Sequence, residues 1–132
     1  MRVAFALLVA ALCIFECSAY MQNITVKGVA VCNKKRLANV QVELWEKDTL
    51  DPDDLLNTVQ TNSEGEFEVY GEQDETHAIV PYIRVLHNCN PSKPNCNRIG
   101  EYIVPKDKIG GIYDMTYLTL DIKVHGEKEK CK

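Results

Sequence analysis

The sequence predicts an all-β fold, a sandwich of seven short strands in two packed antiparallel sheets with Greek-key connections. Hydrophobic and polar residues alternate over several short stretches, and turn residues separate these stretches at short intervals. No long stretch has the hydrophobic spacing of an amphipathic helix. Many short strands with frequent turns are typical of a β-sandwich.

Alternation is clearest in residues 40–45, 66–70 and 118–124, each of which predicts a strand with one buried face. In the first stretch the valines and the leucine are expected to face the core, and Trp45 is expected to face outward. Runs that are more apolar or less regular predict the central strands. The seven strands are expected to begin at Val26, Val40, Asn57, Glu66, Ile79, Ile99 and Tyr113.

Polar turn residues connect the predicted strands. Asn33–Leu37 and Asn62–Gly65 are predicted to form hairpins, the second with a glycine that can adopt a positive φ. Asp51–Leu56 predicts one short helical turn, because Asp51 can cap it and the next residue, a proline, suits the first helical position. These carboxylates and Asp48 could instead bind calcium. The spacing of an EF-hand loop is absent, so capping is the favoured interpretation.

Residues 1–19 have the features of a secretory signal peptide. Arg2 supplies a positive charge, Val3–Phe15 form an apolar run, and small residues precede Tyr20. The run is shorter than the about 20 apolar residues that cross a membrane. The sequence therefore predicts a secreted chain that does not span a membrane, with one domain at residues 20–132.

Four cysteines remain after removal of the signal peptide, an even number that predicts two disulfides in an oxidising compartment. If each connection reverses the chain, the strands beginning at Val26, Asn57, Ile79 and Tyr113 run in one direction and the other three run in the opposite one. These directions place all four cysteines at one pole of the sandwich, where two pairings are equally favoured. One pairing joins Cys89 to Cys96 and Cys32 to Cys131; the other joins Cys32 to Cys89 and Cys96 to Cys131. A zinc site is not predicted, because no CxxC pair exists and the histidines show no ligand spacing.

Charge and motifs narrow the class of function. The formal net charge of −4 at pH 7 argues against nucleic-acid binding. No serine nucleophile elbow or phosphate-binding loop is present, and Cys89 near His87 is interpreted as half of a disulfide instead of a thiol nucleophile. The sequence therefore predicts no catalytic residue, no cofactor and no metal. Asn23–Thr25 forms a glycosylation sequon, so a surface glycan is predicted at Asn23.

Five motifs in order carry a resemblance to a known family. They are VKGVAVC (Val26–Cys32), VQVELWEKDTLDPDDLL (Val40–Leu56), TNSEGEFEVYG (Thr61–Gly71), IVPYIRVLHNC (Ile79–Cys89) and KPNCNR (Lys93–Arg98). Together they resemble the nematode transthyretin-like protein family over about residues 24–124. The resemblance implies a secreted nematode protein with the transthyretin (prealbumin-like, immunoglobulin-like) type of β-sandwich, in agreement with the strand pattern.

The resemblance implies an extracellular, non-enzymatic module that binds a protein or lipid partner. A carrier of a small apolar ligand or hormone is the alternative, since vertebrate transthyretin shares this type of fold. A hydrolase of the 5-hydroxyisourate type is a further alternative. That enzyme resemblance depends on a histidine and arginine constellation and a Tyr-Arg-Gly-Ser carboxyl terminus, and this chain ends differently.

Three aromatic residues, Trp45, Tyr70 and Tyr82, are predicted to face outward and to form a candidate partner surface. Tryptophan and tyrosine are enriched in the hot spots of protein interfaces. A loop or neighbouring charged side chains could instead cover them. The sequence specifies neither the partner nor the oligomeric state.

Overall fold

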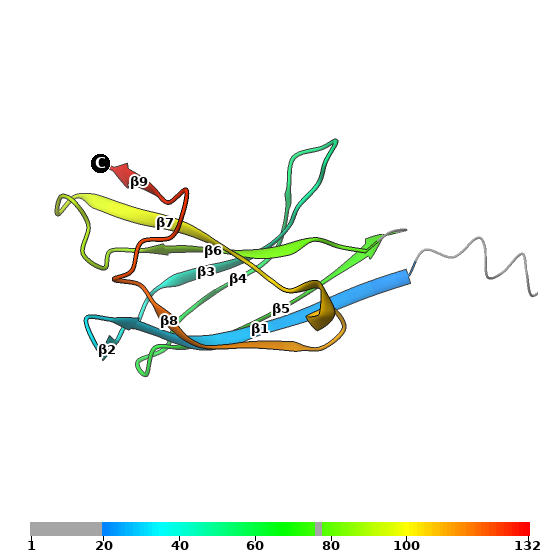
Figure 1. Ribbon diagram of the computed structural model, residues 1–132, viewed down its shortest axis with the longest axis horizontal. Helices are drawn as coiled ribbons and strands as arrows, with labels where there is room; N and C mark the ends of the chain where they lie inside the picture. Colours follow the sequence, from blue (N-terminus) through cyan, green and yellow to red (C-terminus); the bar gives the residue numbers. More distant parts are fainter. Residues whose placement is uncertain (1–19, 76–77) are drawn as a thin grey trace, which may run out of the picture.

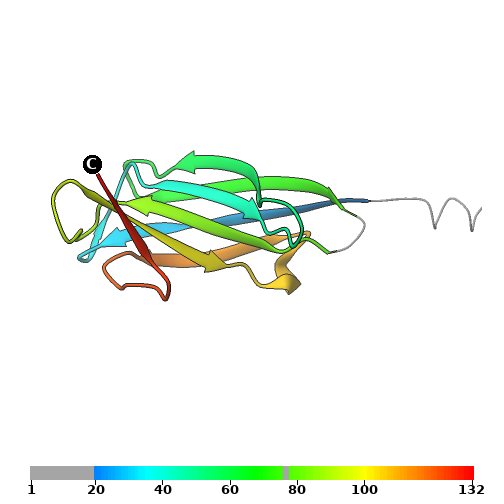
Figure 2. The ribbon, with the colours of Figure 1, turned by 90° about the horizontal axis from the view of Figure 1, so that it is seen from above.

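The computed structural model describes residues 20–75 and 78–132, so the predicted signal peptide at residues 1–19 lies outside the described residues. Two sheets pack face to face, as predicted, and the longer strands run roughly along the long axis of the molecule, which the short last strand crosses (Figures 1 and 2). The strands are β1 (Tyr20–Cys32), β2 (Lys35–Arg36), β3 (Gln41–Glu46), β4 (Asp54–Gln60), β5 (Glu66–Glu75), β6 (Pro81–His87), β7 (Cys96–Ile103), β8 (Ile112–Thr119) and β9 (Lys128–Cys131). The helical structure of the described residues is limited to the 3-10 helix η1 (Lys106–Lys108), and no helix there is long and apolar enough to cross a membrane.

The chain crosses between the two sheets several times. Strands β1, β2, β5 and β8 form sheet A, and sheet B has the order β4-β3-β6-β7-β9. The described pairings are antiparallel except for β1 with β8, which run parallel. The predicted common direction of the first and last long strands is therefore correct. Two short strands, β2 and β9, raise the number from the predicted seven to nine.

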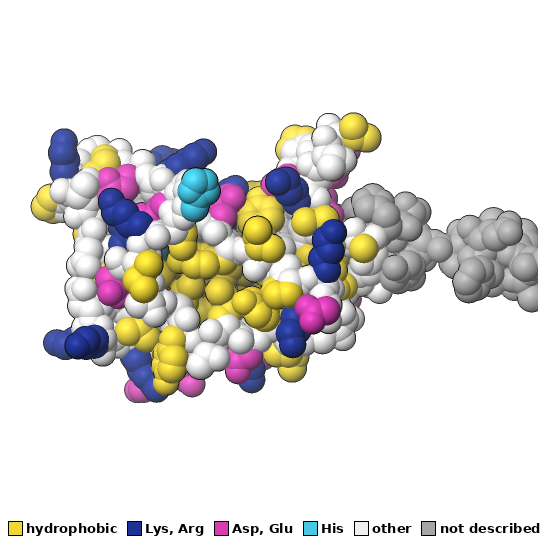
Figure 3. All heavy atoms as spheres, in the orientation of Figure 1, with side chains coloured by type: hydrophobic (Ala, Val, Ile, Leu, Met, Phe, Trp, Pro, Cys, Tyr) yellow, Lys and Arg dark blue, Asp and Glu magenta, His cyan; other side chains and the backbone are white. Residues whose placement is uncertain are grey.

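The core forms between the inner faces of the two sheets. In β3, Val42 and Leu44 are fully buried, and Trp45 on the outer face is half-buried, so the predicted alternation is correct. A fully buried aliphatic side chain of this size stabilises the fold by about 1.5 to 3 kcal/mol. Other fully buried core residues are Ile24, Val26, Val69, Ile79, Ile83, Val85 and Leu120. On the side seen in Figure 3, hydrophobic side chains reach the surface between charged ones.

Strand β8 contains a β-bulge. Lys27 of β1 pairs with Asp114, and Val29 pairs with Tyr117, so three steps along β8 correspond to two steps along β1. The extra residue falls near Thr116, which has a φ of 64°. The alternation of inward and outward side chains along β8 therefore shifts by one residue at this point.

The prediction of one regular strand over residues 118–124 is wrong. After the bulge Leu118 is buried, but the strand ends at Thr119 and the chain turns there. The N–H of Ile122 donates to the carbonyl of Thr119, and the Ile122 side chain is exposed. Apolar alternation continues in the sequence past the point where pairing with β1 stops.

Both predicted turns exist, but neither joins two of the predicted strands in a hairpin, because β1 and β5 lie in sheet A while β3 and β4 lie in sheet B. Asn33 and Lys34 have positive φ, as a tight two-residue hairpin turn requires, and they connect β1 to β2. Gly65, with a φ of 75°, ends the turn at Asn62–Gly65, which leads from β4 in sheet B to β5 in sheet A. The prediction of a hairpin at this second turn is wrong. Strand β5 pairs along all ten of its residues with the longer strand β1. Strand β4, with seven residues, pairs with β3 instead.

The helical turn predicted at Asp51–Leu56 is also wrong. Residues 47–53 form a loop that stands away from the sandwich, and the next residue begins β4 (Figure 1). Oδ1 of Asp53 accepts a hydrogen bond of 3.1 Å from the N–H of Asp48, and its Oδ2 accepts one of 2.6 Å from the hydroxyl of Tyr82. The hydrogen bond from Tyr82 of β6 outweighs the local preference of these residues for a helix cap.

Candidate partner-binding surface

The three predicted surface aromatics do not form one patch. Trp45 and Tyr82 are cross-strand partners on the outer face of sheet B, whereas Tyr70 lies on β5 in sheet A. Tyr70 is 47% exposed, as predicted. Tyr82 is only 8% exposed, so the prediction of its exposure is wrong.

Two contacts explain why Tyr82 is covered on an outer face. Its ring stacks against Trp45 with a centroid distance of 6.5 Å and an interplanar angle of 9°. Its hydroxyl donates to Asp53 in the loop that precedes β4. This bond is the main cause that lowers the pKa of the Asp53 carboxyl, and burial raises the pKa of the Tyr82 hydroxyl. The loop is therefore linked through Asp53 to the Tyr82 ring, and through that ring to Trp45.

Trp45 is held between charged side chains. The Arg84 guanidinium carbon lies 4.5 Å from the ring centroid, within the range of a cation–π interaction. The indole Nε1 donates to Oε1 of Glu43 at 2.9 Å. Arg84 donates from Nε and Nη2 to Oε2 of Glu101, at 3.0 and 2.8 Å. We refer to Trp45, Tyr82, Arg84, Glu43 and Glu101 as the Trp45 surface.

A groove of about 420 Å³ borders the Trp45 surface. Leu86 of β6 and Ile99 of β7 contribute apolar side chains to it, and Lys128 of β9 contributes a charge. The groove therefore joins apolar contact area to several hydrogen-bonding groups. This combination suits a protein partner better than a purely apolar ligand.

The cysteines form two disulfides, Cys32–Cys89 and Cys96–Cys131, which is one of the two pairings that the sequence left open. The end of β1, the start of β7 and the end of β9 lie at the same pole, on the left in Figure 1. The first disulfide connects the two sheets, and the second joins neighbouring strands of sheet B. Neither pair offers a free thiol, in agreement with the interpretation of Cys89 as a structural residue.

A buried ion pair lies at this disulfide pole and was not predicted. The side chain of Arg98 is 1% exposed and donates from Nε and Nη2 to the two carboxylate oxygens of Glu127, at 2.7 and 2.8 Å. Its Nη1 donates to the carbonyl of Cys89 at 2.6 Å. This bidentate geometry is typical of strong charge-assisted hydrogen bonds. A lone arginine in the sequence gives no sign of such burial, because its partner lies 29 positions away.

His87 adjoins this ion pair, and its burial leads us to expect a stability that depends on pH. Its Nδ1 accepts a hydrogen bond of 3.0 Å from the N–H of Cys89, and burial lowers its pKa from 6.5 to about 4, with Arg98 adding to the shift. The unfolded chain binds this proton more readily than the folded one. The free energy of unfolding is therefore expected to fall by about 2 to 3 kcal/mol as the pH drops from 6.5 to 4.

Urea denaturation at a series of pH values, on the wild type and on His87→Gln, measures this contribution. The two curves should differ in slope between these pH values. Equal slopes would show that other groups cause the acid sensitivity.

Two further predictions concern the surface. Asn23 lies on the half-exposed face of β1, and its carbonyl accepts a bond from the N–H of Gly110, but glycosylation there stays a prediction. Carboxylate oxygens of Glu46, Asp48 and Asp54 lie within 4.8 Å of one another. Glu46 is buried and Asp54 is exposed, and the expectation that this cluster holds no metal stays a prediction as well.

Comparisons with known proteins agree with the sequence motifs. The TTR-52 model of the transthyretin-like family matches residues 27–105. Transthyretin-like protein 16 of Caenorhabditis elegans is 72% identical over 132 residues, which is 100% of each chain. Transthyretin-like protein 5 of the same species is 33% identical over 117 residues, covering 83% of this chain and 84% of that protein. The chain therefore belongs to the nematode transthyretin-like family.

Proposed function

We propose that this chain is an extracellular, non-enzymatic module that binds a partner protein through the Trp45 surface. The two disulfides and the family are consistent with an extracellular location, and the predicted signal peptide supports secretion. The four cysteines within the described residues are all in disulfides, and Nδ1 of His87 is occupied by a backbone N–H. These observations favour binding over catalysis.

The half-buried indole of Trp45 carries the proposal. Its Arg84, Tyr82 and Glu43 contacts fix the ring orientation before any partner arrives, so little side-chain freedom is lost on binding. Tryptophan, tyrosine and arginine are also the residue types most enriched in interface hot spots.

The charges of the surface favour a protein over a lipid partner. Glu43 and Glu101 both lie on this face and would repel the phosphates of an anionic membrane. Arg84 is already engaged by Glu101 through two hydrogen bonds. A protein can instead match positive and negative groups at defined places.

Trp45→Ala is expected to weaken partner binding by at least about 2 kcal/mol, because truncating an anchor of this kind removes contact area and leaves Arg84, Tyr82 and Glu43 without the ring that they contact. Pull-downs with the mature domain, from nematode extracellular extracts and from a panel of lipid vesicles, identify the partner first. Binding of the wild type and the variant is then compared by calorimetry.

Tyr70→Ala is the matched control, because it also removes an exposed aromatic side chain but from sheet A. It should leave binding unchanged, and both variants should keep the wild-type circular dichroism spectrum. A folded Trp45→Ala variant that retains full binding would contradict the proposal. Capture by vesicles alone would replace the protein partner with a lipid.

A further inference from the structure

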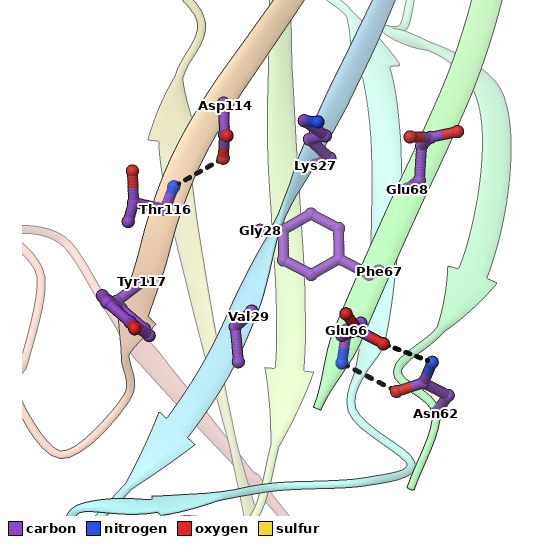
Figure 4. A pocket seen from close by; sticks show the side chains of 10 residues that line it. All are labelled: Lys27, Gly28, Val29, Asn62, Glu66, Phe67, Glu68, Asp114, Thr116 and Tyr117. Carbon is purple, nitrogen blue, oxygen red and sulfur yellow. Dashed lines mark hydrogen bonds between the residues drawn. The ribbon is translucent and has the colours of Figure 1, made fainter. Parts of the chain in front are cut away.

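A second hollow, of about 500 Å³, lies on sheet A among β1, β5 and β8 (Figure 4). Lys27 contributes from the central strand β1, Glu68 from β5, and Asp114 and Tyr117 from β8. None of these residues belongs to the Trp45 surface on sheet B. The hollow is therefore a separate candidate binding site.

The β-bulge of β8 places two consecutive side chains at this hollow. In a regular strand Thr116 and Tyr117 would point to opposite faces, but both line the hollow and both are exposed. The N–H of Thr116 donates to Oδ1 of Asp114 at 2.9 Å, which holds the distorted backbone in place. The Tyr117 side chain is 60% exposed, so its ring is available to a ligand.

The order of charges across the strands limits the ligand. Lys27 is paired in register with Glu68 on one side and with Asp114 on the other, so the cation lies between two carboxylates. A cationic ligand at the centre would meet Lys27, and an anionic ligand would meet carboxylates on either side. A neutral ligand that both donates and accepts hydrogen bonds fits this arrangement.

The rim adds further hydrogen-bonding groups. Nδ2 of Asn62 donates to Oε1 of Glu66 at 3.2 Å, which leaves the second Glu66 oxygen facing the same region (Figure 4). The hollow thus combines carboxylate acceptors, an ammonium donor, a hydroxyl group and an aromatic ring. Sugars present the complementary groups, since their hydroxyls donate and accept while their C–H faces are apolar.

We propose that this hollow binds a neutral carbohydrate. The Tyr117 ring packs against the apolar face of one sugar unit. Glu68 and Asp114 accept hydrogen bonds from sugar hydroxyls, and Lys27 donates to a hydroxyl or ring oxygen. The site goes beyond the proposed protein-binding function and does not depend on it.

The test uses the mature domain and a panel of immobilised neutral oligosaccharides built from glucose, galactose, mannose and N-acetylglucosamine. We expect retention on at least one member, with an affinity then measured by titration with the same free sugar. Tyr117→Ala should weaken this affinity at least about tenfold, because the stacking surface is lost. Tyr117→Phe keeps the ring and should retain most of the affinity.

Tyr70→Ala serves as the matched control, because it removes an exposed tyrosine of the same sheet outside the hollow. Raising NaCl from about 0.1 to about 1 M shortens the screening length from about 10 to about 3 Å and should change the affinity little for a neutral ligand. Failure to retain any oligosaccharide would overturn the proposal. So would binding that falls steeply with salt, or that Tyr70→Ala and Tyr117→Ala weaken equally.

Discussion

Replacing Arg98 by methionine is expected to lower the free energy of unfolding by about 3 to 5 kcal/mol. Methionine retains much of the buried volume but leaves the carboxylate of Glu127, whose side chain is 8% exposed, without its bidentate partner. The carbonyl of Cys89 loses a hydrogen bond as well. Urea denaturation near neutral pH measures the loss.

The double variant Arg98→Met/Glu127→Met separates the cost of an unpaired charge from the value of the ion pair. Removing both charges is expected to restore most of the lost stability, since buried ion pairs are often replaceable by apolar side chains. A double variant as unstable as the single one would mean that Arg98 acts mainly through packing or through Cys89.

Removing the Cys32–Cys89 disulfide, through Cys32→Ala with Cys89→Ala, is expected to cost about 4 kcal/mol. The bond spans 57 positions of the sequence, and its loss frees a long loop of the unfolded chain. It also fixes the end of β1, in sheet A, to the segment that follows β6 in sheet B. Thermal and urea denaturation of the variant measure the effect.

The Cys96–Cys131 disulfide offers a comparison, through Cys96→Ala with Cys131→Ala. It ties β9, an exposed strand at the chain terminus, to its neighbour β7. We expect β9 to detach locally more readily than the strands within the sandwich, and therefore a smaller loss of stability. Equal losses of stability in the two variants would argue that a disulfide between the sheets stabilises the fold no more than one within a sheet.

Much of the fold follows from local alternation. The period of two in β3 and β5 identifies both strands and the faces that they bury, because the face of each sheet that packs against the core must be apolar. Strand β2 has two residues and β9 has four exposed ones, so neither carries a pattern. The helical turn predicted at Asp51–Leu56 is wrong because Asp53 is held by Tyr82, a tertiary hydrogen bond that no local pattern shows.

The candidate site was predicted only in part, because alternation shows the direction of a side chain but not its contacts with distant residues. Alternation is sufficient to predict that Trp45 faces outward, because the direction of one side chain follows from its position in its own strand. The cover over Tyr82 depends on a cross-strand ring and on a carboxylate from a loop. The roles of Arg84 and Glu101 likewise depend on the register between β6 and β7, which the sequence does not show.

The bulge of β8 also changes what the open edge of sheet A offers to an unpaired strand. Among the described strands β8 pairs with β1 alone, so its other edge presents backbone groups that could template a foreign strand. The extra residue near Thr116 breaks the regular spacing of those groups about halfway along. An incoming strand can match only a few residues before its register fails. We therefore expect the same distortion that shapes the hollow to make this open edge of sheet A a poor template for aggregation.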